Sequence, residues 1–264
     1  MDDGLFFLGT AGDAIVASKQ FASSAGMLYK YGDTMFLLDP GPGSLVRAKQ
    51  YEVNLRELTA VFLSTPDWIH SNDVNAVISA MTYEGLDPRG LLVLSKDALA
   101  QGNDSLQIVS PMHRAFVERT LALDTGARIG INNIDVHSIG LEKSNGIGYV
   151  FDAPEHTTAY IPHTSFSEEL AKNLRGVGTL ILHLRNRTRE EAGFLNIPQA
   201  IDLLKIAQPK RCILTGYGMK VLEHDPMDIA RQIHKATGIE VIAPKDGLYI
   251  PHLKTKGQKT LGSF

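Results

Sequence analysis

The sequence predicts an α/β protein in which two packed sheets carry helices on their outer faces. Short apolar runs rich in Val, Ile, Leu and aromatic residues recur along the chain, with turn residues between them, and each has the length of a strand. Helical patterns enter after residue 70 and then alternate with further strands. The order of strands followed by mixed strand and helix occurs twice, which favours two sheets packed against each other.

The predicted strands follow from these runs in chain order. The tripeptide YGD between the second and third runs predicts a hairpin. The runs are GLFFLG (4–9), GMLYKYG (26–32), TMFLLDPG (34–41), AVFLST (60–65), LLVLSK (91–96), IDVHSIG (134–140), GIGYVFD (146–152), TTAYIPH (157–163), TLILHL (179–184), RCILTG (211–216) and EVIAPKDGLYI (240–250).

The predicted helices are identified by apolar spacing and by end signals. In the first, apolar residues recur at helical spacing, and Ser71 or Asn72 could cap its start. Gly238 is a good stop signal for the last helix. The helices cover the segment of Val74, Val77, Ile78 and Met81, then residues 167–174, 197–207 and 226–237.

Length and composition are those of an ordinary globular protein. A chain of 264 residues with 44% hydrophobic content can bury a substantial core. We find no repeat, low-complexity tract or interdomain linker, so we expect one domain over residues 1–252 and a loosely ordered tail over 253–264. A net charge of -3 provides no general attraction to nucleic acid or to an anionic membrane.

The cysteine content indicates a reducing compartment. Cys212 is the only cysteine and lies in an apolar run, so we expect a buried structural thiol and no thiolate metal cluster. No segment reaches the roughly 18 apolar residues of a membrane span, and the acidic N-terminus lacks a signal-peptide core. We therefore expect a cytoplasmic protein without a membrane partner.

Distinctive residues stand at the strand ends: GTAG, DPGPG, LSTPDWIHSND, PHTS, LTGYG and PKDGL. From Phe7 to Ile250 their order and spacing resemble the metallo-β-lactamase superfamily, within it the branch of ribonuclease Z-like hydrolases and phosphodiesterases. The resemblance implies a four-layer αββα sandwich with two mixed sheets flanked by helices. By analogy with that branch it also implies a homodimer.

The loop after the fourth strand carries the metal-binding HxHxDH motif in that family, whose residues hold one or two metal ions, usually zinc. Aligned on this motif, Thr65 takes the first His position, Asp67 the second, Ile69 the Asp position and His70 the last His position. The resemblance therefore implies a degenerate motif in which one ligand of four is unchanged.

The remaining family ligands map to three other segments. Lys143 falls at the third His, His163 at the metal-bridging Asp, and Gly216 at the final His. Asp39 matches an aspartate that braces the metal loop by hydrogen bonds, although an aspartate before Pro-Gly is also a common turn residue. Asp246 and Gly247 match a further family feature near the C-terminus.

A hydrolytic zinc site needs about three protein ligands and an open position for water. The residues at four of the family positions (Thr65, Ile69, Lys143 and Gly216) cannot serve, which excludes the usual dinuclear centre. Asp67, His70 and His163 could still hold one Zn²⁺ or another divalent ion. The interpretation that we favour is that no metal binds and that the two histidines form hydrogen bonds in a polar pocket.

Two functional hypotheses follow, and they leave open whether the protein is an enzyme. In the favoured one, the chain is a non-catalytic descendant of a metallo-hydrolase with a binding or assembly role towards a small molecule or protein. In the alternative, a mononuclear site at Asp67, His70 and His163 hydrolyses a phosphoester or another small ester. Metal analysis separates the two hypotheses.

The other histidines are scattered without ligand-like spacing and are more often structural in such contexts. His183 could point towards the cleft because it ends a strand. The segment RNRTREE (185–191) after it is expected to be a solvated loop, with an anion-binding patch as the alternative. The other six are His113, His137, His156, His224, His234 and His252.

Loss of a divalent ion leaves acidic ligands uncompensated, so a fixed cation is expected in its place. We predict that Lys143 forms a salt bridge with Asp67. If this pair is buried, Lys143→Ala should cost roughly 3–5 kcal/mol of stability.

Overall fold

A computed structural model describes residues 2–99 and 108–254. The first sheet has the order β14-β1-β2-β3-β4-β5-β6 and the second the order β13-β12-β11-β10-β9-β8-β7. The strands are β1 (Gly4–Phe7), β2 (Met27–Tyr31), β3 (Thr34–Leu38), β4 (Ala60–Leu63), β5 (Leu91–Ser95), β6 (Arg119–Leu123), β7 (Arg128–Ile131), β8 (Ile134–Gly140), β9 (Ile147–Asp152), β10 (Thr157–Ile161), β11 (Thr179–His183), β12 (Arg211–Thr215), β13 (Glu240–Ile242) and β14 (Tyr249–Pro251).

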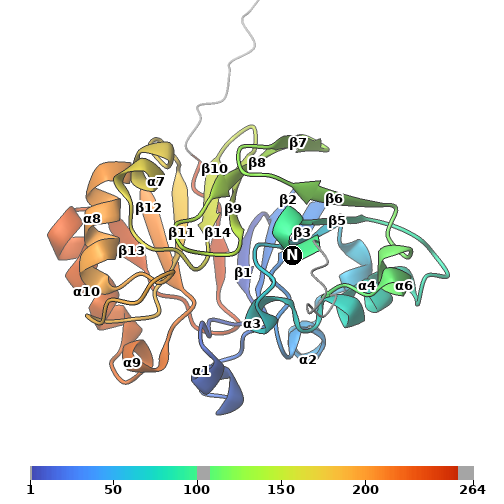
Figure 1. The fold of residues 1–264 in the computed structure, drawn as a ribbon, viewed down its shortest axis with the longest axis horizontal. Coiled ribbons are helices and arrows are strands. Elements are labelled where there is room, and N and C mark those ends of the chain that lie inside the picture. The colour runs from blue at the N-terminus through green and yellow to red at the C-terminus, as the bar shows by residue number, and fades with distance from the viewer. Residues whose placement is uncertain (1, 100–107, 255–264) are drawn as a thin grey trace, which may run out of the picture.

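The longer helices lie on the outer faces of the two sheets, whereas α1 (Ala14–Ser18) and α3 (Trp68–Ser71) lie at one edge of the sandwich (Figure 1). The other helices are α2 (Ser44–Gln50), η1 (Leu55–Glu57), α4 (Val74–Thr82), α5 (Lys96–Leu99), α6 (Pro111–Arg114), α7 (Glu168–Asn173), α8 (Ile197–Ala207), α9 (Met219–Leu222) and α10 (Pro226–Thr237). Helices α7, α8 and α10 cover the second sheet, and α4 and α6 lie on the side of the first. This arrangement confirms the predicted sandwich of two mixed sheets between helices.

Three apolar layers hold the sandwich together. Aromatic residues of both sheets, among them Phe36, Phe62 and Phe151, fill the space between the sheets. A second layer packs α8 and α10 against the second sheet, and a third packs α4 against the first. The central strands β3, β4, β11 and β12 therefore bury both faces, which explains why the sequence shows continuous apolar runs there.

Several local predictions are confirmed. The hairpin turn at Gly32–Asp33 joins β2 and β3, with Tyr31 paired to Thr34. Helices α8 and α10 have the predicted bounds, and Gly238 caps α10 with a positive φ of 75°. Cys212 is buried in β12, as expected.

Other local predictions need correction. Helix α4 begins at Val74 with Asp73 at its N-cap, because Ser71 belongs to the separate helix α3, where its hydroxyl donates to the carbonyl of Asp67. The run over residues 240–250 forms two strands in different sheets, since Pro244 and the following turn interrupt it. Strands β6 and β7 were not predicted, because charged and glycine residues break their apolar pattern.

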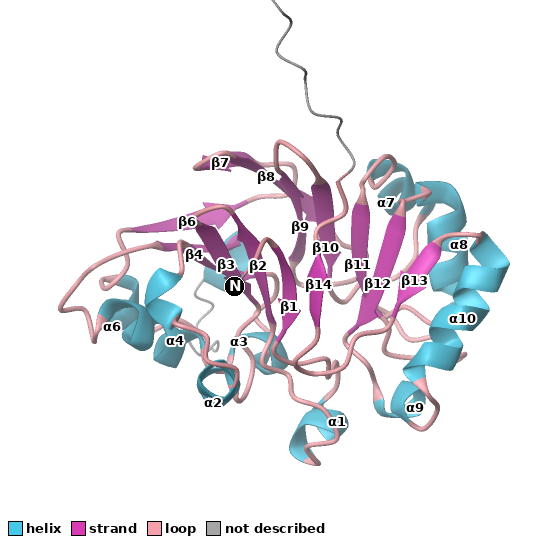
Figure 2. Cartoon of the chain, turned by 180° about the vertical axis from the view of Figure 1, so that it is seen from behind, coloured by secondary structure: helices cyan, strands magenta, loops and turns pink. Residues whose placement is uncertain are grey.

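Parallel pairing brings the functional loops to one edge of the sandwich. Strands β3 and β4 run parallel, as do β10, β11 and β12, so the loops that follow each set leave from a common edge (Figure 2). Most of the segment 253–264, expected to be a loose tail, lies outside the described residues. Within the described ranges, no helix has the length and apolar character needed to cross a membrane.

Candidate metal centre

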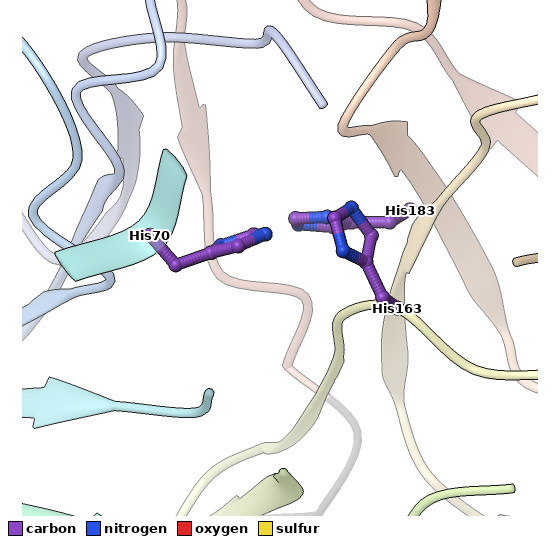
Figure 3. Close-up of side chains that lie close together, drawn as sticks. All are labelled: His70, His163 and His183. Atoms are coloured by element: carbon purple, nitrogen blue, oxygen red, sulfur yellow. The ribbon is translucent and has the colours of Figure 1, made fainter. Parts of the chain in front are cut away.

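Three buried histidines converge at this edge. His70 lies in α3, His163 follows β10, and His183 is the last residue of β11. Figure 3 shows the three rings directed towards one another. Each ring offers one nitrogen, and these three nitrogens lie within 4.8 Å of one another. The His70 and His163 ring centroids are 4.6 Å apart.

Local structure explains how each ring reaches the centre. The Asp67 carboxylate caps α3 by accepting a hydrogen bond from the amide of Ile69, so the chain turns into a helix directly after β4 and buries His70 in its last turn. Strands β10 and β11 pair in parallel, and His163 and His183 therefore emerge at the same sheet edge.

A buried carboxylate, that of Asp39, holds the surroundings of the histidines by hydrogen bonds. Asp39 accepts hydrogen bonds from the Ser64 amide at 2.7 Å and from the Tyr160 hydroxyl at 2.7 Å, and its carboxylate also accepts from the Ser64 hydroxyl. It also lies 3.1 Å from Nδ1 of His70. The bracing role expected for Asp39 thus has a structural basis, since this one side chain links β3, β4, β10 and α3.

The hydrogen bonds of Asp39 fix where two of the rings carry their proton. Because a carboxylate only accepts, Nδ1 of His70 must donate, which leaves the lone pair on Nε2. Tyr160 gives its proton to Asp39, so its oxygen accepts from Nε2 of His183 at 3.2 Å and the lone pair of that ring is on Nδ1.

The third ring is held in the same way. The His163 ring hydrogen-bonds the backbone of Gly12, and its Nε2 has no partner. Nε2 of His70 and Nδ1 of His183 are likewise buried without a hydrogen bond. Buried imidazole nitrogens are normally satisfied. Three buried nitrogens without partners face one another, and the second nitrogen of each ring is held by a neighbouring group, which is an arrangement that could hold a metal ion.

Burial keeps two of these rings neutral. It lowers the pKa of His183 to about 3, an effect strengthened by His70 and opposed by Asp39. Burial also lowers the pKa of His163 well below its ordinary value, and His70, His183 and Arg185 add to this effect. Neutral imidazole is the form that binds a metal ion. The residues present therefore fit one divalent ion of the type that prefers nitrogen ligands.

The space beside the rings is small. A cavity of about 20 Å³, lined by side chains that include His70, His183, Asp39 and Ile69, lies at this point. A volume near 10–15 Å³ is needed to hold one water molecule. The cavity accordingly admits an ion or a water but not an organic substrate.

Two residues predicted for the site lie elsewhere. Asp67 is exposed and serves as the helix cap, so the structure does not bring it into the group of ligands. Lys143 is also exposed, and in the described part of the chain no salt bridge joins it to Asp67. The predicted pair is therefore wrong, since neither side chain enters a setting that requires a counter-charge.

The other aligned positions surround the centre without donating to it. Thr65 is buried and its hydroxyl accepts from the amide of Asp67. Ile69 and Gly216 line the cavity.

Substitution of Lys143 by alanine is expected to change the free energy of unfolding by less than about 0.5 kcal/mol, because the side chain is exposed. Urea unfolding of both proteins measures this difference. A loss above about 2 kcal/mol that Asp67→Asn relieves would instead demonstrate the salt bridge.

His183 is not among the metal ligands that the sequence predicted. Its position at the end of a strand was the available signal, and the pairing of β11 with β10 and β12 supplies the rest. The loop after it is not simply solvated, since the Arg185 guanidinium lies 4.0 Å from the Phe194 ring centre and Phe194 packs against His163.

Comparisons with known proteins agree with the fold. An uncharacterised protein of Methanocaldococcus jannaschii is 25% identical over 255 residues, which are 96% of each chain. The metallo-β-lactamase fold protein YhfI from Bacillus subtilis has a TM-score of 0.77 at 17% identity, covering 93% of this chain and 98% of that one. Zn²⁺-bound PqqB from Methylobacterium extorquens has a TM-score of 0.70 at 14% identity, covering 93% and 99%.

The short form of human tRNase Z is also similar, with a TM-score of 0.68 at 12% identity over 94% of this chain and 99% of that one. Residues 34–217 match the model of the beta-lactamase superfamily domain. The chain belongs to the beta-lactamase superfamily and has the metallo-β-lactamase fold.

Proposed function

We propose that this protein binds a single divalent transition-metal ion through His70, His163 and His183, and that it has a non-catalytic binding or assembly role. The observation that carries the proposal is the convergence of three buried nitrogens without hydrogen-bond partners. This ligand set replaces the one that the sequence suggested, with His183 in place of Asp67.

The three histidines come from both sheets, which supports a role of the ion in stabilising the fold. His70 follows a strand of the first sheet, whereas His163 and His183 follow strands of the second. An ion held by all three rings would therefore join the two halves of the sandwich. Metal binding to the folded state raises the free energy of unfolding, and this gain grows with the logarithm of the ratio of metal concentration to Kd.

The small volume of the cavity supports the non-catalytic assignment. A phosphoester or small ester requires far more room than the cavity of about 20 Å³. Two of the ligand positions that the family resemblance implies carry Ile69 and Gly216, neither of which has a side-chain donor.

Metal analysis of protein purified without chelators is expected to give about one divalent ion per chain. Alanine at His70, His163 or His183 should each weaken binding by more than about 100-fold, since even the loss of a supporting residue costs 10–100-fold. Two controls should retain the ion: Asp67→Ala, because this residue is an exposed cap, and His137→Ala, because it lies outside the group. A chain that binds no ion, or loses it with Asp67, refutes the proposed site.

A mononuclear hydrolase is the second candidate. Three protein ligands leave a fourth position open in a tetrahedral site, where a bound ion acidifies water. The metal-loaded protein should be assayed with bis(p-nitrophenyl) phosphate and p-nitrophenyl acetate. Metal-dependent turnover that disappears in His70→Ala would favour the hydrolase, whereas we expect none.

The setting that we propose is the cytoplasm, and the assembly is a homodimer. The single buried cysteine supports a reducing compartment. The molar mass of the purified chain, measured by light scattering, tests the dimer. The mass of a monomer would contradict this part of the proposal.

A further inference from the structure

We propose that Gly216 is a positioning residue for His183: it leaves the space in which the His183 ring reaches the metal centre from β11. This inference rests on the proposed function of the three-histidine site. It assigns a role to a residue that lines the cavity and has no side chain of its own.

The geometry excludes a side chain at position 216 while His183 is in place. A Cβ added to Gly216 would lie 2.3 Å from both Cγ and Nδ1 of His183, far inside van der Waals contact. Nδ1 is the nitrogen that carries the lone pair facing the centre. The same atom of His183 would thus be displaced first.

Neither side of this contact can move freely. The His183 ring is held by Tyr160 through Nε2, and its strand pairs with Thr215 of β12. On the other side, the amide of Tyr217 donates to the carbonyl of Thr10 at 2.8 Å, which ties the Gly216 loop to the loop after β1. An added Cβ would therefore force His183 itself to shift, since Cβ of His183 would also lie only 2.7 Å away.

The loop of Gly216 also contacts Gly12, which links the surroundings of His183 to those of His163. The Gly12 amide donates to the carbonyl of Tyr217 at 2.9 Å, and a Cβ on Gly12 would lie 1.9 Å from the carbonyl oxygen of Gly216. Gly12 also provides the backbone hydrogen bond of the His163 ring. The close approach of these two glycines thus sets the positions of His163 and His183 relative to each other.

The inference explains why the centre can have three imidazoles although position 216 lacks one. The resemblance of the chain to its family places a histidine at 216, where Gly216 now stands. In this conformation a Cβ at 216 would overlap the His183 ring, and the nitrogen on this side of the centre comes from the neighbouring parallel strand. The two positions are adjacent in the sheet, since His183 pairs with the residue before Gly216.

The test compares Gly216→Ala with Gly176→Ala. Both glycines have positive φ, 60° and 83°, but an added Cβ at Gly176 meets nothing within 4 Å, so the control carries the backbone strain without the contact. We expect Gly216→Ala to weaken Co²⁺ and Zn²⁺ binding at least about tenfold and to change the Co²⁺ absorption spectrum. Gly176→Ala should match the wild type in both.

A comparison of single and double variants separates an effect of Gly216 on the His183 ring from a general destabilisation of the protein. His183→Ala and the double variant His183→Ala/Gly216→Ala should bind metal equally weakly, because the ring that Gly216 positions is already absent. A further loss in the double variant would show that Gly216 acts on the site by another route. Unchanged affinity in Gly216→Ala would overturn the inference while leaving the metal site itself intact.

Two further measurements distinguish a failure of the Gly216 inference from a failure of metal binding or of folding. In metal-free protein, the ¹⁵N shifts of the His183 ring should change in Gly216→Ala and not in Gly176→Ala, which tests positioning even if the wild type binds no metal. If Gly216→Ala does not fold, the exchange variant His183→Gly/Gly216→His replaces it. This variant is expected to bind one ion per chain, and failure of the folded variant to bind metal that the wild type binds would contradict the inference.

Discussion

Replacement of Asp39 by alanine is expected to lower the free energy of unfolding by more than about 3 kcal/mol, because it removes the acceptor of several buried donors and each donor left unsatisfied costs about 1–3 kcal/mol. The carboxylate is buried and accepts from the Ser64 amide, the Tyr160 hydroxyl and Nδ1 of His70. Burial opposes its ionisation, but His70 and the hydrogen bonds from His70 and Ser64 hold the pKa of Asp39 below its usual value. Removal of the carboxylate leaves these donors unsatisfied.

Asp39→Asn is the matched control, measured by urea unfolding beside the alanine variant. Asparagine keeps the shape and tolerates the positive φ of 51° at this position. It retains one acceptor oxygen, so we expect a smaller loss, about 1–3 kcal/mol. Equal stability of Asp39→Ala and the wild type would contradict the proposed network.

The second large effect is a loss of stability in mild acid. Burial lowers the pKa of His183 to about 3 and that of His252 to about 4, and it places the pKa of His163 well below its ordinary range. In the unfolded chain, each of these residues has an ordinary pKa near 6.5. Below that pH the unfolded state binds protons that the folded state does not, so stability falls as the pH is lowered from about 6.5 towards the folded-state values.

The expected loss between pH 7.5 and pH 5 is about 2 kcal/mol for each of the three histidines, or about 6 kcal/mol together. Chemical unfolding of chelator-treated protein across this range measures it. A His183→Gln variant should lose about one third less than the wild type over the same interval, whatever its stability at pH 7.5. A stability that stays constant down to pH 5 would show that these histidines titrate normally.

The sequence was sufficient to predict the sandwich and to single out two of the three clustered histidines, His70 and His163. The apolar runs of strands β3, β4, β10 and β11 are continuous because both faces are buried, so their lengths and order could be read directly. The distinctive residues at their ends then located Asp39, His70 and His163, since a residue that follows a parallel strand must lie at the common edge.

The direction of each side chain could not be predicted in the same way. Asp67 and His70 are three residues apart in one loop, yet one is exposed and the other buried, because α3 begins at residue 68 and uses Asp67 as its cap. The role of His183 depends on strand pairing and on the missing Cβ of Gly216, neither of which is visible in the motif itself. Lys143 was placed beside Asp67 by the family resemblance and by charge reasoning, and both side chains are exposed instead.

An anomalous difference map from crystals of the metal-loaded protein, recorded at the absorption edge of the bound metal, tests the central claim most directly. The proposed site predicts one peak bonded to Nε2 of His70, Nε2 of His163 and Nδ1 of His183, at about 2.0–2.1 Å if the ion is zinc. The absence of a peak among these rings, or a peak held by Asp67, would contradict it.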